Sequence, residues 1–165
     1  MDKTPGEQAA AIAMARSLNI TILGERPPVR PPVDLATLEA AIEQSWSAQT
    51  SYYANWTPQN PAYGQCAVTA LIVQDHLGGD LVRQVITPGQ AHFWNQLKDG
   101  TKVDLTERQF ALAPAIREPA TTSPVRQRLL AYLPTAARYQ LLKAAVEKNL
   151  AEMVVPEVVR ELAVG

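Results

Sequence analysis

The sequence predicts an α+β fold, and three patterns support this expectation. Residues 66–77 are apolar on nearly all sides, as in a buried helix, and a pair of glycines ends the pattern. Three strand candidates follow at 80–87, 91–97 and 101–106. Helical patterns precede and follow this group. We therefore expect a helix packed on a small antiparallel sheet, with helical N- and C-terminal extensions.

The composition indicates a globular protein of one domain with appendages. The chain has 165 residues, of which 47% are hydrophobic and 19% charged, and its formal net charge is −1. This balance supports a buried core and offers no basic surface to nucleic acid. No apolar run approaches the roughly 20 residues of a membrane span, so we expect no membrane partner.

The single cysteine and the N-terminal residues indicate a cytoplasmic protein. One cysteine cannot form an internal disulfide, and one cysteine with two histidines is too few for a structural zinc site. Arg16 and Ser17 interrupt the N-terminal apolar stretch, unlike in a secretory signal peptide. We expect neither a metal nor a cofactor.

Residues 1–33 are expected to form an N-terminal helix and a proline-rich linker. Alanines, with Pro5 in the first turn, favour a helix over 5–18, and 19–24 could be an edge strand. Four prolines within 25–33 exclude a helix and favour an extended polyproline form. This stretch is a stiff linker or, alternatively, a groove ligand for a partner.

Residues 34–113 are expected to form the core. Asp34 is a suitable N-cap for a helix, because the next residues carry one apolar stripe. This stripe consists of Leu35, Leu38, Ala41, Ile42 and Trp46. The polar, aromatic and proline-containing residues 47–63 indicate a loop, and 107–112 indicate a helical turn.

Residues 114–165 are expected to form a helical C-terminal extension. The pattern is helical from about residue 124, with breaks expected at Pro134 and Pro156. Its apolar stripes consist of Leu129, Leu130, Leu133, Leu141, Leu142, Val146 and Leu150. We expect these helices either to pack on the core or to pair with a partner.

Cys66 is the candidate nucleophile because it begins the apolar helix. The first turn of a helix carries unpaired backbone N–H groups and the positive end of the dipole, which favour a thiolate and can hold an oxyanion. Gly64, two residues earlier, lets a substrate approach the backbone closely. A buried, inert structural thiol is the alternative interpretation.

His92 is the candidate base. The other histidine, His76, lies ten residues along the helix of Cys66, about 15 Å away at 1.5 Å per residue, and Asp75 is excluded for the same reason. A strand packed beside the start of the helix can bring His92 to the thiol. Taken alone, a histidine here is also compatible with a polar residue at a sheet edge.

Asp104 can orient His92 in only one of two hairpin registers. A two-residue loop at 99–100 points Asp104 to the face opposite His92. A three-residue loop at 98–100 pairs Leu97 with Thr101 and makes Asp104 a diagonal neighbour of His92, roughly 7–8 Å away at the backbone. We prefer this register because it separates a polar face from a mostly apolar one. The polar face carries His92, Trp94, Gln96, Lys102, Asp104 and Thr106, and the other carries Phe93, Leu97, Val103 and Leu105 with Asn95 and Thr101.

The motif around the cysteine resembles the nucleophile motif of transglutaminases. It reads Tyr63-Gly64-Gln65-Cys66, and His92-Phe93-Trp94-Asn95, Asp99-Gly100 and Val103-Asp104-Leu105-Thr106 are similar to the second half of that signature. Residues 64–70, the glycine pair, 92–95 and 104–110 resemble the bacterial YunG-like family more closely still. Alanine follows the cysteine and leucine follows the aspartate, where transglutaminases commonly have tryptophan and proline.

The resemblance covers roughly 54–112 and implies a papain-like core in which Cys66, His92 and Asp104 form a triad. In such enzymes a glutamine or tryptophan helps to hold the oxyanion, and the corresponding candidates here are Gln59, Gln65 and Trp56. Trp94 is a candidate to shield the triad from water or to line a substrate groove. Loop or core packing is the alternative for these four residues.

The expected function is thiol-dependent acyl transfer or amide hydrolysis, as in a thiol protease, a deamidase or a transglutaminase-like enzyme. The expected substrate is a protein or peptide amide, and neither it nor the acyl acceptor is identified by the sequence. The alternative is a catalytically silent binding or regulatory module on the same fold.

Overall fold

The computed structural model describes residues 32–110, 120–122 and 124–162, and side chains up to Met153. Contacts divide the chain into two units, Met1–Pro32 and Val33–Gly165, and only the second is described below. The predicted helix at 5–18, the strand at 19–24 and nearly all of the proline-rich linker lie outside the described residues.

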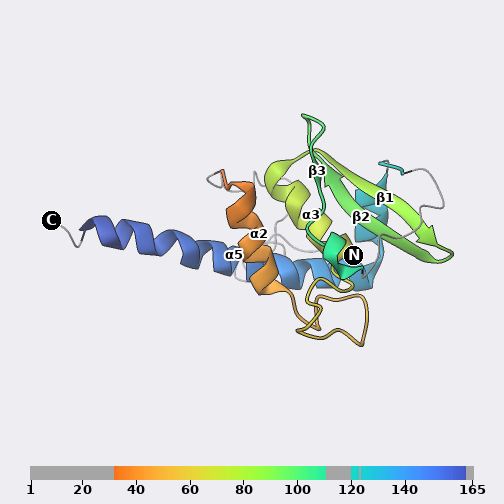
Figure 1. The fold of residues 1–165 in the computed structure, drawn as a ribbon, viewed down its shortest axis with the longest axis horizontal. Coiled ribbons are helices and arrows are strands. Elements are labelled where there is room, and N and C mark those ends of the chain that lie inside the picture. The colour runs from red at the N-terminus through yellow and green to blue at the C-terminus, as the bar shows by residue number, and fades with distance from the viewer. Residues whose placement is uncertain (1–31, 111–119, 123, 163–165) are drawn as a thin grey trace, which may run out of the picture. The chain divides into compact units, whose positions relative to one another are not determined.

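The described unit is an α+β fold with one small antiparallel sheet, as the sequence predicts (Figure 1). Its three strands are hydrogen-bonded in the order β1-β2-β3. The elements in chain order are α2 (Leu35–Ser45), α3 (Cys66–Leu77), β1 (Asp80–Thr87), β2 (Gln90–Gln96), β3 (Lys102–Val103), the 3-10 turn η1 (Glu107–Gln109), α4 (Val125–Ala131) and α5 (Leu133–Leu162).

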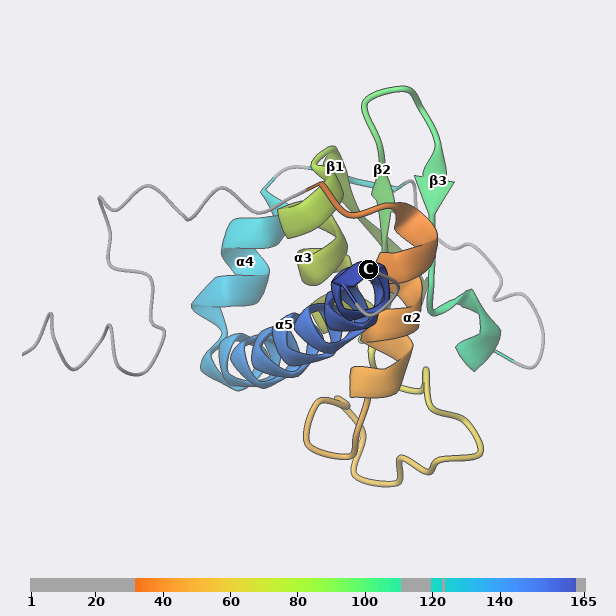
Figure 2. The same cartoon turned by 90° about the vertical axis from the view of Figure 1, so that its left-hand side faces the viewer.

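Helix α3 is the central element of the described unit. It contacts β2 on one side and α5 on another, while α2 packs across α5 (Figures 1 and 2). Six consecutive residues of α3, from Val68 to Val73, are buried. A helix enclosed in this way must be apolar on nearly all sides, which accounts for the composition of 66–77.

The hydrophobic core joins the helices to the sheet. Leu142 and Val146 of α5 are fully buried in the same cluster as Leu38 and Ile42 of α2 and Leu71 of α3. The C-terminal helices therefore pack on the core, which was one of the two alternatives for them. Leu133 and Leu141 of the predicted apolar stripes are exposed instead.

The boundaries of the first two helices follow from local chemistry. The Asp34 carboxylate accepts a hydrogen bond from the backbone N–H of Thr37 at 3.0 Å, which confirms Asp34 as the N-cap of α2. The N–H of Gly78 donates to Gln74 O at the end of α3. Gly78 has a φ of 71° but a ψ of −149°, so this cap lies outside the left-handed helical region that glycine commonly adopts at the end of a helix.

Gly79 lets α3 and β2 approach each other closely, and its replacement by alanine should lower the free energy of unfolding by about 2–3 kcal/mol. A Cβ at Gly79 would lie against Gln96 O and 2.8 Å from Leu97 Cα, whereas one at Gly78 would meet nothing within 4 Å. Both glycines have a positive φ, so Gly78→Ala shares only the backbone strain of about 1–2 kcal/mol. Urea unfolding followed by tryptophan fluorescence measures both, and equal losses would contradict the close approach.

The β2–β3 hairpin has the predicted three-residue loop. Asn95 pairs with Val103, and the N–H of Leu97 donates to Thr101 O at 2.9 Å. Gly100, with a φ of 88°, closes the loop, as predicted. The apolar face also agrees, because the core contains Val103 and packs against Phe93, Leu97 and Leu105.

Two elements differ from the sequence prediction. Strand β3 covers only Lys102–Val103 rather than 101–106, since the chain turns away from the sheet at Asp104. The helical break occurs at Tyr132, between α4 and α5, and Pro134 lies in the first turn of α5, where the missing N–H costs nothing. Helix α5 continues to Leu162 past Pro156, so the predicted break there is wrong.

No helix within the described residues has the length and hydropathy needed to cross a membrane.

Candidate functional site

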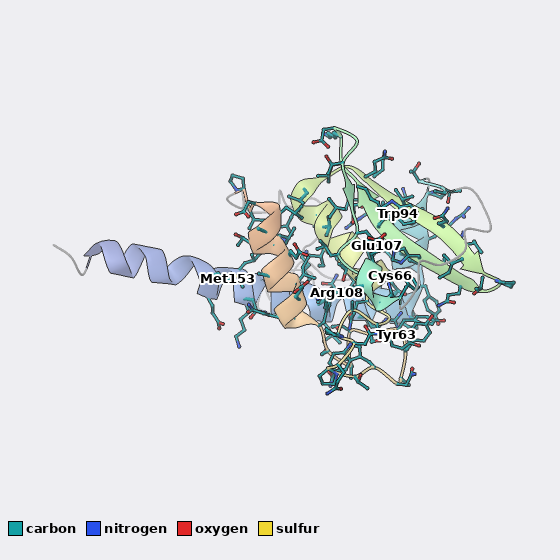
Figure 3. All side chains as sticks on the ribbon, in the orientation of Figure 1. Tyr63, Cys66, Trp94, Glu107, Arg108 and Met153 are labelled. Atoms are coloured by element: carbon teal, nitrogen blue, oxygen red, sulfur yellow. The ribbon has the colours of Figure 1, made fainter. Side chains whose placement is uncertain are left out.

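Cys66 is the first residue of α3, as the sequence predicts (Figure 3). The residue before it, Gln65, makes no side-chain capping hydrogen bond to the first turn. The backbone N–H groups of this turn are therefore not occupied by a cap, and they lie at the positive end of the helix dipole. The thiol is free and only partly buried, so a reagent can reach it.

His92 and Asp104 form a buried hydrogen-bonded pair. The His92 Nε2 atom lies 2.7 Å from Asp104 Oδ2, and the two side chains are only 7% and 4% exposed. The other carboxylate oxygen accepts from the Thr106 hydroxyl at 3.4 Å. The three-residue hairpin loop creates this pair, because it places both residues on the same face of the sheet.

Aromatic rings enclose the imidazole. Trp94 stacks on His92 with 5.7 Å between ring centroids, and Phe110 meets it edge-on at 5.0 Å. The Lys102 ammonium group lies 5.5 Å from the centre of the Trp94 ring and 3.4 Å from Asp104 Oδ2. These contacts keep water from the His92–Asp104 hydrogen bond, and a low local dielectric strengthens that bond.

Burial and pairing act in opposite directions on the two titrating groups. Burial lowers the pKa of His92, but its hydrogen bonds to Asp104 and Cys66 outweigh burial and raise that pKa to about 9. Burial likewise raises the pKa of Asp104, and the hydrogen bond and charge of His92 outweigh it, so the pKa of Asp104 lies below its usual value. The site therefore favours an imidazolium beside a carboxylate.

Cys66 and Asp104 approach the same imidazole. The contribution of Cys66 to the raised pKa of His92 indicates that the thiol lies near the ring. Asp104 lies at Nε2, and the Gln109 amide lies 3.4 Å from Nδ1. The structure thus places Cys66, in the first turn of α3, near the hydrogen-bonded His92–Asp104 pair.

Gln109 is a site residue that the sequence did not single out. Its Nε2 atom lies 3.4 Å from His92 Nδ1, and its Oε1 atom accepts from the Gly64 N–H at 3.3 Å. Asn60 donates to the Gln109 backbone oxygen at 3.4 Å. These contacts fix an amide donor beside the thiol and the imidazole. The sequence feature that could have identified Gln109 as a site residue is its position three residues after Thr106, in the turn that follows Asp104.

The predicted auxiliary donors lie elsewhere. The Trp56 indole N–H donates to Pro61 O at 2.9 Å, and Gln65 Nε2 donates to Ser47 O at 3.0 Å. Gln59 is exposed on the loop. Trp94, a candidate for shielding the triad from water or for lining a groove, stacks on His92. Loop packing accounts for the contacts of Trp56 and Gln65.

A cavity of about 300 Å³ opens beside the thiol. Cys66, Gly64, Gln109 and Phe110 line it on the side of the site. Strands β1 and β2 and helices α4 and α5 supply the other walls. Its volume lies at the lower end of the range for small-ligand sites. Among the described residues no group of three His, Cys, Asp or Glu side chains is placed to hold a metal ion.

These features define an α+β protein in which a cysteine at a helix N-terminus meets a buried histidine–aspartate pair beside a cavity. The family model described as YunG protein matches residues 34–151, which is more than half of the chain, so the chain belongs to the YunG family. It is 41% identical over 69 residues to the uncharacterized protein YunG of Bacillus subtilis (strain 168), covering 42% of this chain and 56% of that relative. The chain thus spans about half the length of the curated relative it matches. No solved structure matches it.

Proposed function

We propose that this protein is a thiol-dependent amide hydrolase or acyltransferase on a papain-like, transglutaminase-like core. Cys66 is the nucleophile, His92 its base and Asp104 the group that orients the base. The observation that carries the proposal is the buried 2.7 Å contact between His92 and Asp104, and the contribution of Cys66 to the raised pKa of His92 supports it. A base oriented by a buried carboxylate is one of the roles by which such triads are recognised, and this supports the proposal.

The first half-reaction acylates the enzyme. Nδ1 of His92 takes the thiol proton, and the Cys66 thiolate attacks the carbonyl carbon of an amide, forming a C–S bond and an oxyanion. The intermediate collapses with cleavage of the C–N bond, and the imidazolium returns its proton to the leaving amine. Asp104 accepts a hydrogen bond from the Nε2–H group throughout. Its negative charge stabilises the imidazolium.

The second half-reaction releases the acyl group. With His92 again as base, water attacks the thioester carbonyl and yields a carboxylic acid, or an amine attacks and yields a new amide. The Cys66 thiol is regenerated in both cases. The first outcome corresponds to hydrolysis or deamidation, and the second to acyl transfer.

Two donors are placed to stabilise the oxyanion. The first is the backbone N–H of Cys66, which belongs to the uncapped first turn of α3. The second is Gln109 Nε2, which is held beside His92 Nδ1 by the bond between Gly64 N–H and Gln109 Oε1. The proposal gives Gln109 the role for which Gln59, Gln65 and Trp56 were candidates.

The rate of Cys66 alkylation by iodoacetamide between pH 5 and 10 tests the proposal. The chain has one cysteine, so the label reports on Cys66 alone. A free thiol with the ordinary pKa of about 8.5 is only ~0.3% thiolate at pH 6, whereas a thiolate paired with an imidazolium persists there. We expect the wild type to react at least about tenfold faster than His92→Ala at pH 6.

His76→Ala is the matched control, because it removes the other histidine from the far end of α3, and it should react like the wild type. If the alkylation rates of the wild type and His92→Ala rise with pH in the same way, with a midpoint at about pH 8.5, no thiolate–imidazolium pair forms. That result would overturn the enzyme proposal and favour the alternative function, a catalytically silent binding or regulatory module.

A further inference from the structure

The cavity beside Cys66 is positively charged. Arg83 of β1 and Arg138 of α5 both line it, and no aspartate or glutamate among the described residues does. Two arginines from separate elements thus line the same cavity of about 300 Å³ as Cys66. A cleft lined by charges of one sign concentrates ligands of the opposite sign.

Arg83 is held from both sides. Its Cα pairs with that of Phe93 in β2, and its backbone N–H and carbonyl exchange two 2.8 Å hydrogen bonds with Thr121. Phe93 lines the same cavity. The backbone from which the Arg83 side chain extends is therefore fixed within the sheet, close to the site.

Arg138 is fixed through its guanidinium group. Its Nη2 donates to the Thr135 hydroxyl at 2.9 Å, and the group lies 5.3 Å from the centre of the Tyr52 ring. Thr135 and Tyr52 line the cavity as well. Stacking on an aromatic ring leaves the remaining N–H donors of a guanidinium in one plane, ready for a carboxylate.

Other arginines of the described unit already have carboxylate partners. Arg108 pairs with Glu43 at 2.7 Å, and Arg126 pairs with Asp75 at 2.8 Å. Within the described ranges, neither cavity arginine has a carboxylate within ion-pair distance. Arg128 has no such partner within the described residues either, but it is exposed and does not line the cavity, so Arg83 and Arg138 are the arginines placed to receive a negative group from a ligand in the cavity.

We propose that the cavity binds a carboxylate of the acyl donor, so that the substrate is an amide with a carboxylate close to the scissile bond. The inference rests on the proposed function for the reaction, but its binding part stands on Arg83 and Arg138. Bidentate guanidinium–carboxylate contacts supply both affinity and orientation. The exposed rings of Tyr52 and Tyr132 flank the cavity and can contact the apolar part of the same ligand.

Two alkylating reagents that differ in charge test the proposal. Iodoacetate and iodoacetamide both react by thiolate displacement of iodide to give a thioether, but only iodoacetate carries a carboxylate. We expect the ratio of the iodoacetate rate to the iodoacetamide rate to fall about three- to tenfold in Arg83→Gln and in Arg138→Gln. Arg128→Gln, an exposed arginine that does not line the cavity, should keep the wild-type ratio.

The unmutated protein provides an independent measurement. Its ratio should fall as ionic strength rises from about 0.01 to 1 M, because the Debye length shrinks from about 30 to 3 Å. Ratios that are unaffected both by salt and by the two substitutions would overturn the proposal. This failure is distinct from that of the proposed function, which is judged by the dependence of iodoacetamide labelling on His92.

Three small competitors identify the source of the carboxylate. N-acetylglutamate α-amide has only a side-chain carboxylate, N-acetylglutamine has only an α-carboxylate, and N-acetylglutamine amide has neither. At equal millimolar concentration, one carboxylate compound should slow iodoacetamide labelling more than the neutral amide does. The stronger competitor shows whether the site binds the carboxylate of an acidic side chain or that of a chain terminus. Equal protection of Cys66 by all three compounds overturns the inference.

Discussion

Replacing Leu142 with alanine is expected to lower the free energy of unfolding by about 3–4 kcal/mol. Leu142 lies on α5, is fully buried, and belongs to the core cluster that also contains Leu38 of α2 and Leu71 of α3. Truncation removes buried apolar surface and leaves a cavity among three helices that cannot close it completely. Urea unfolding of the full chain, monitored by tryptophan fluorescence, measures the loss.

The adjacent Leu141 provides a matched control. Its side chain is 54% exposed, so Leu141→Ala should change the free energy of unfolding by no more than about 0.5 kcal/mol. The pair also tests whether α5 packs on the core in solution. Similar, small effects at both positions would mean that α5 is not part of the folded unit.

The free energy of unfolding of the wild type is expected to decrease by about 2–3 kcal/mol between pH 6.5 and pH 9, through His92. The pKa of His92 is raised from 6.5 to about 9 in the folded protein, after the opposing effect of burial. The folded state therefore binds more protons than the unfolded chain within this window. The stabilisation is complete below pH 6.5 and is lost as the pH rises through about 9.

Asp104→Asn should flatten this dependence. Without the carboxylate, the His92 imidazolium loses its main stabilising partner, so the variant should be less stable than the wild type near pH 5.5 and close to it near pH 9.5. Asp104 contributes in the acid range as well, because its lowered pKa gives stability that is lost as the pH falls through that pKa. Urea unfolding across pH 5–10 gives the profiles.

Asp99→Asn is the control for this effect. Asp99 lies in the same hairpin and accepts from the Thr101 N–H at 2.9 Å, but it is exposed and does not contact His92. Its variant should retain the wild-type slope between pH 6.5 and 9. Parallel profiles for Asp104→Asn and the wild type would contradict a raised pKa at His92.

The local parts of the fold could be predicted from the sequence. Helix α3 and strand β1 have the predicted bounds, because an apolar helix, a glycine pair and a strand follow one another without ambiguity. The hairpin loop could be chosen from side-chain parity alone, since only one register separates His92 and Asp104 from Val103. The short length of β3 could not, because it depends on where Asp104 turns toward its partner.

The candidate site could be predicted only where its parts are local. Cys66, His92 and Asp104 were identified from their positions on a helix start and a hairpin, and the structure places them together. Gln109 reaches the site through a turn after the sheet, and no local pattern specifies where such a turn leads. At Pro156 a local pattern was misleading, because a proline normally ends a helix but α5 continues through this residue.

The hairpin has a consequence for the order in which the site assembles during folding. His92 and Asp104 are twelve residues apart and joined by a tight loop, so their contact requires only hairpin closure, which typically takes about 1–10 μs. Cys66 meets them only when α3 docks on β2, across the intervening strand β1. During folding, the contact between His92 and Asp104 is therefore expected to form before Cys66 reaches His92. The Cys66 thiol is then activated only in a molecule whose tertiary structure is complete.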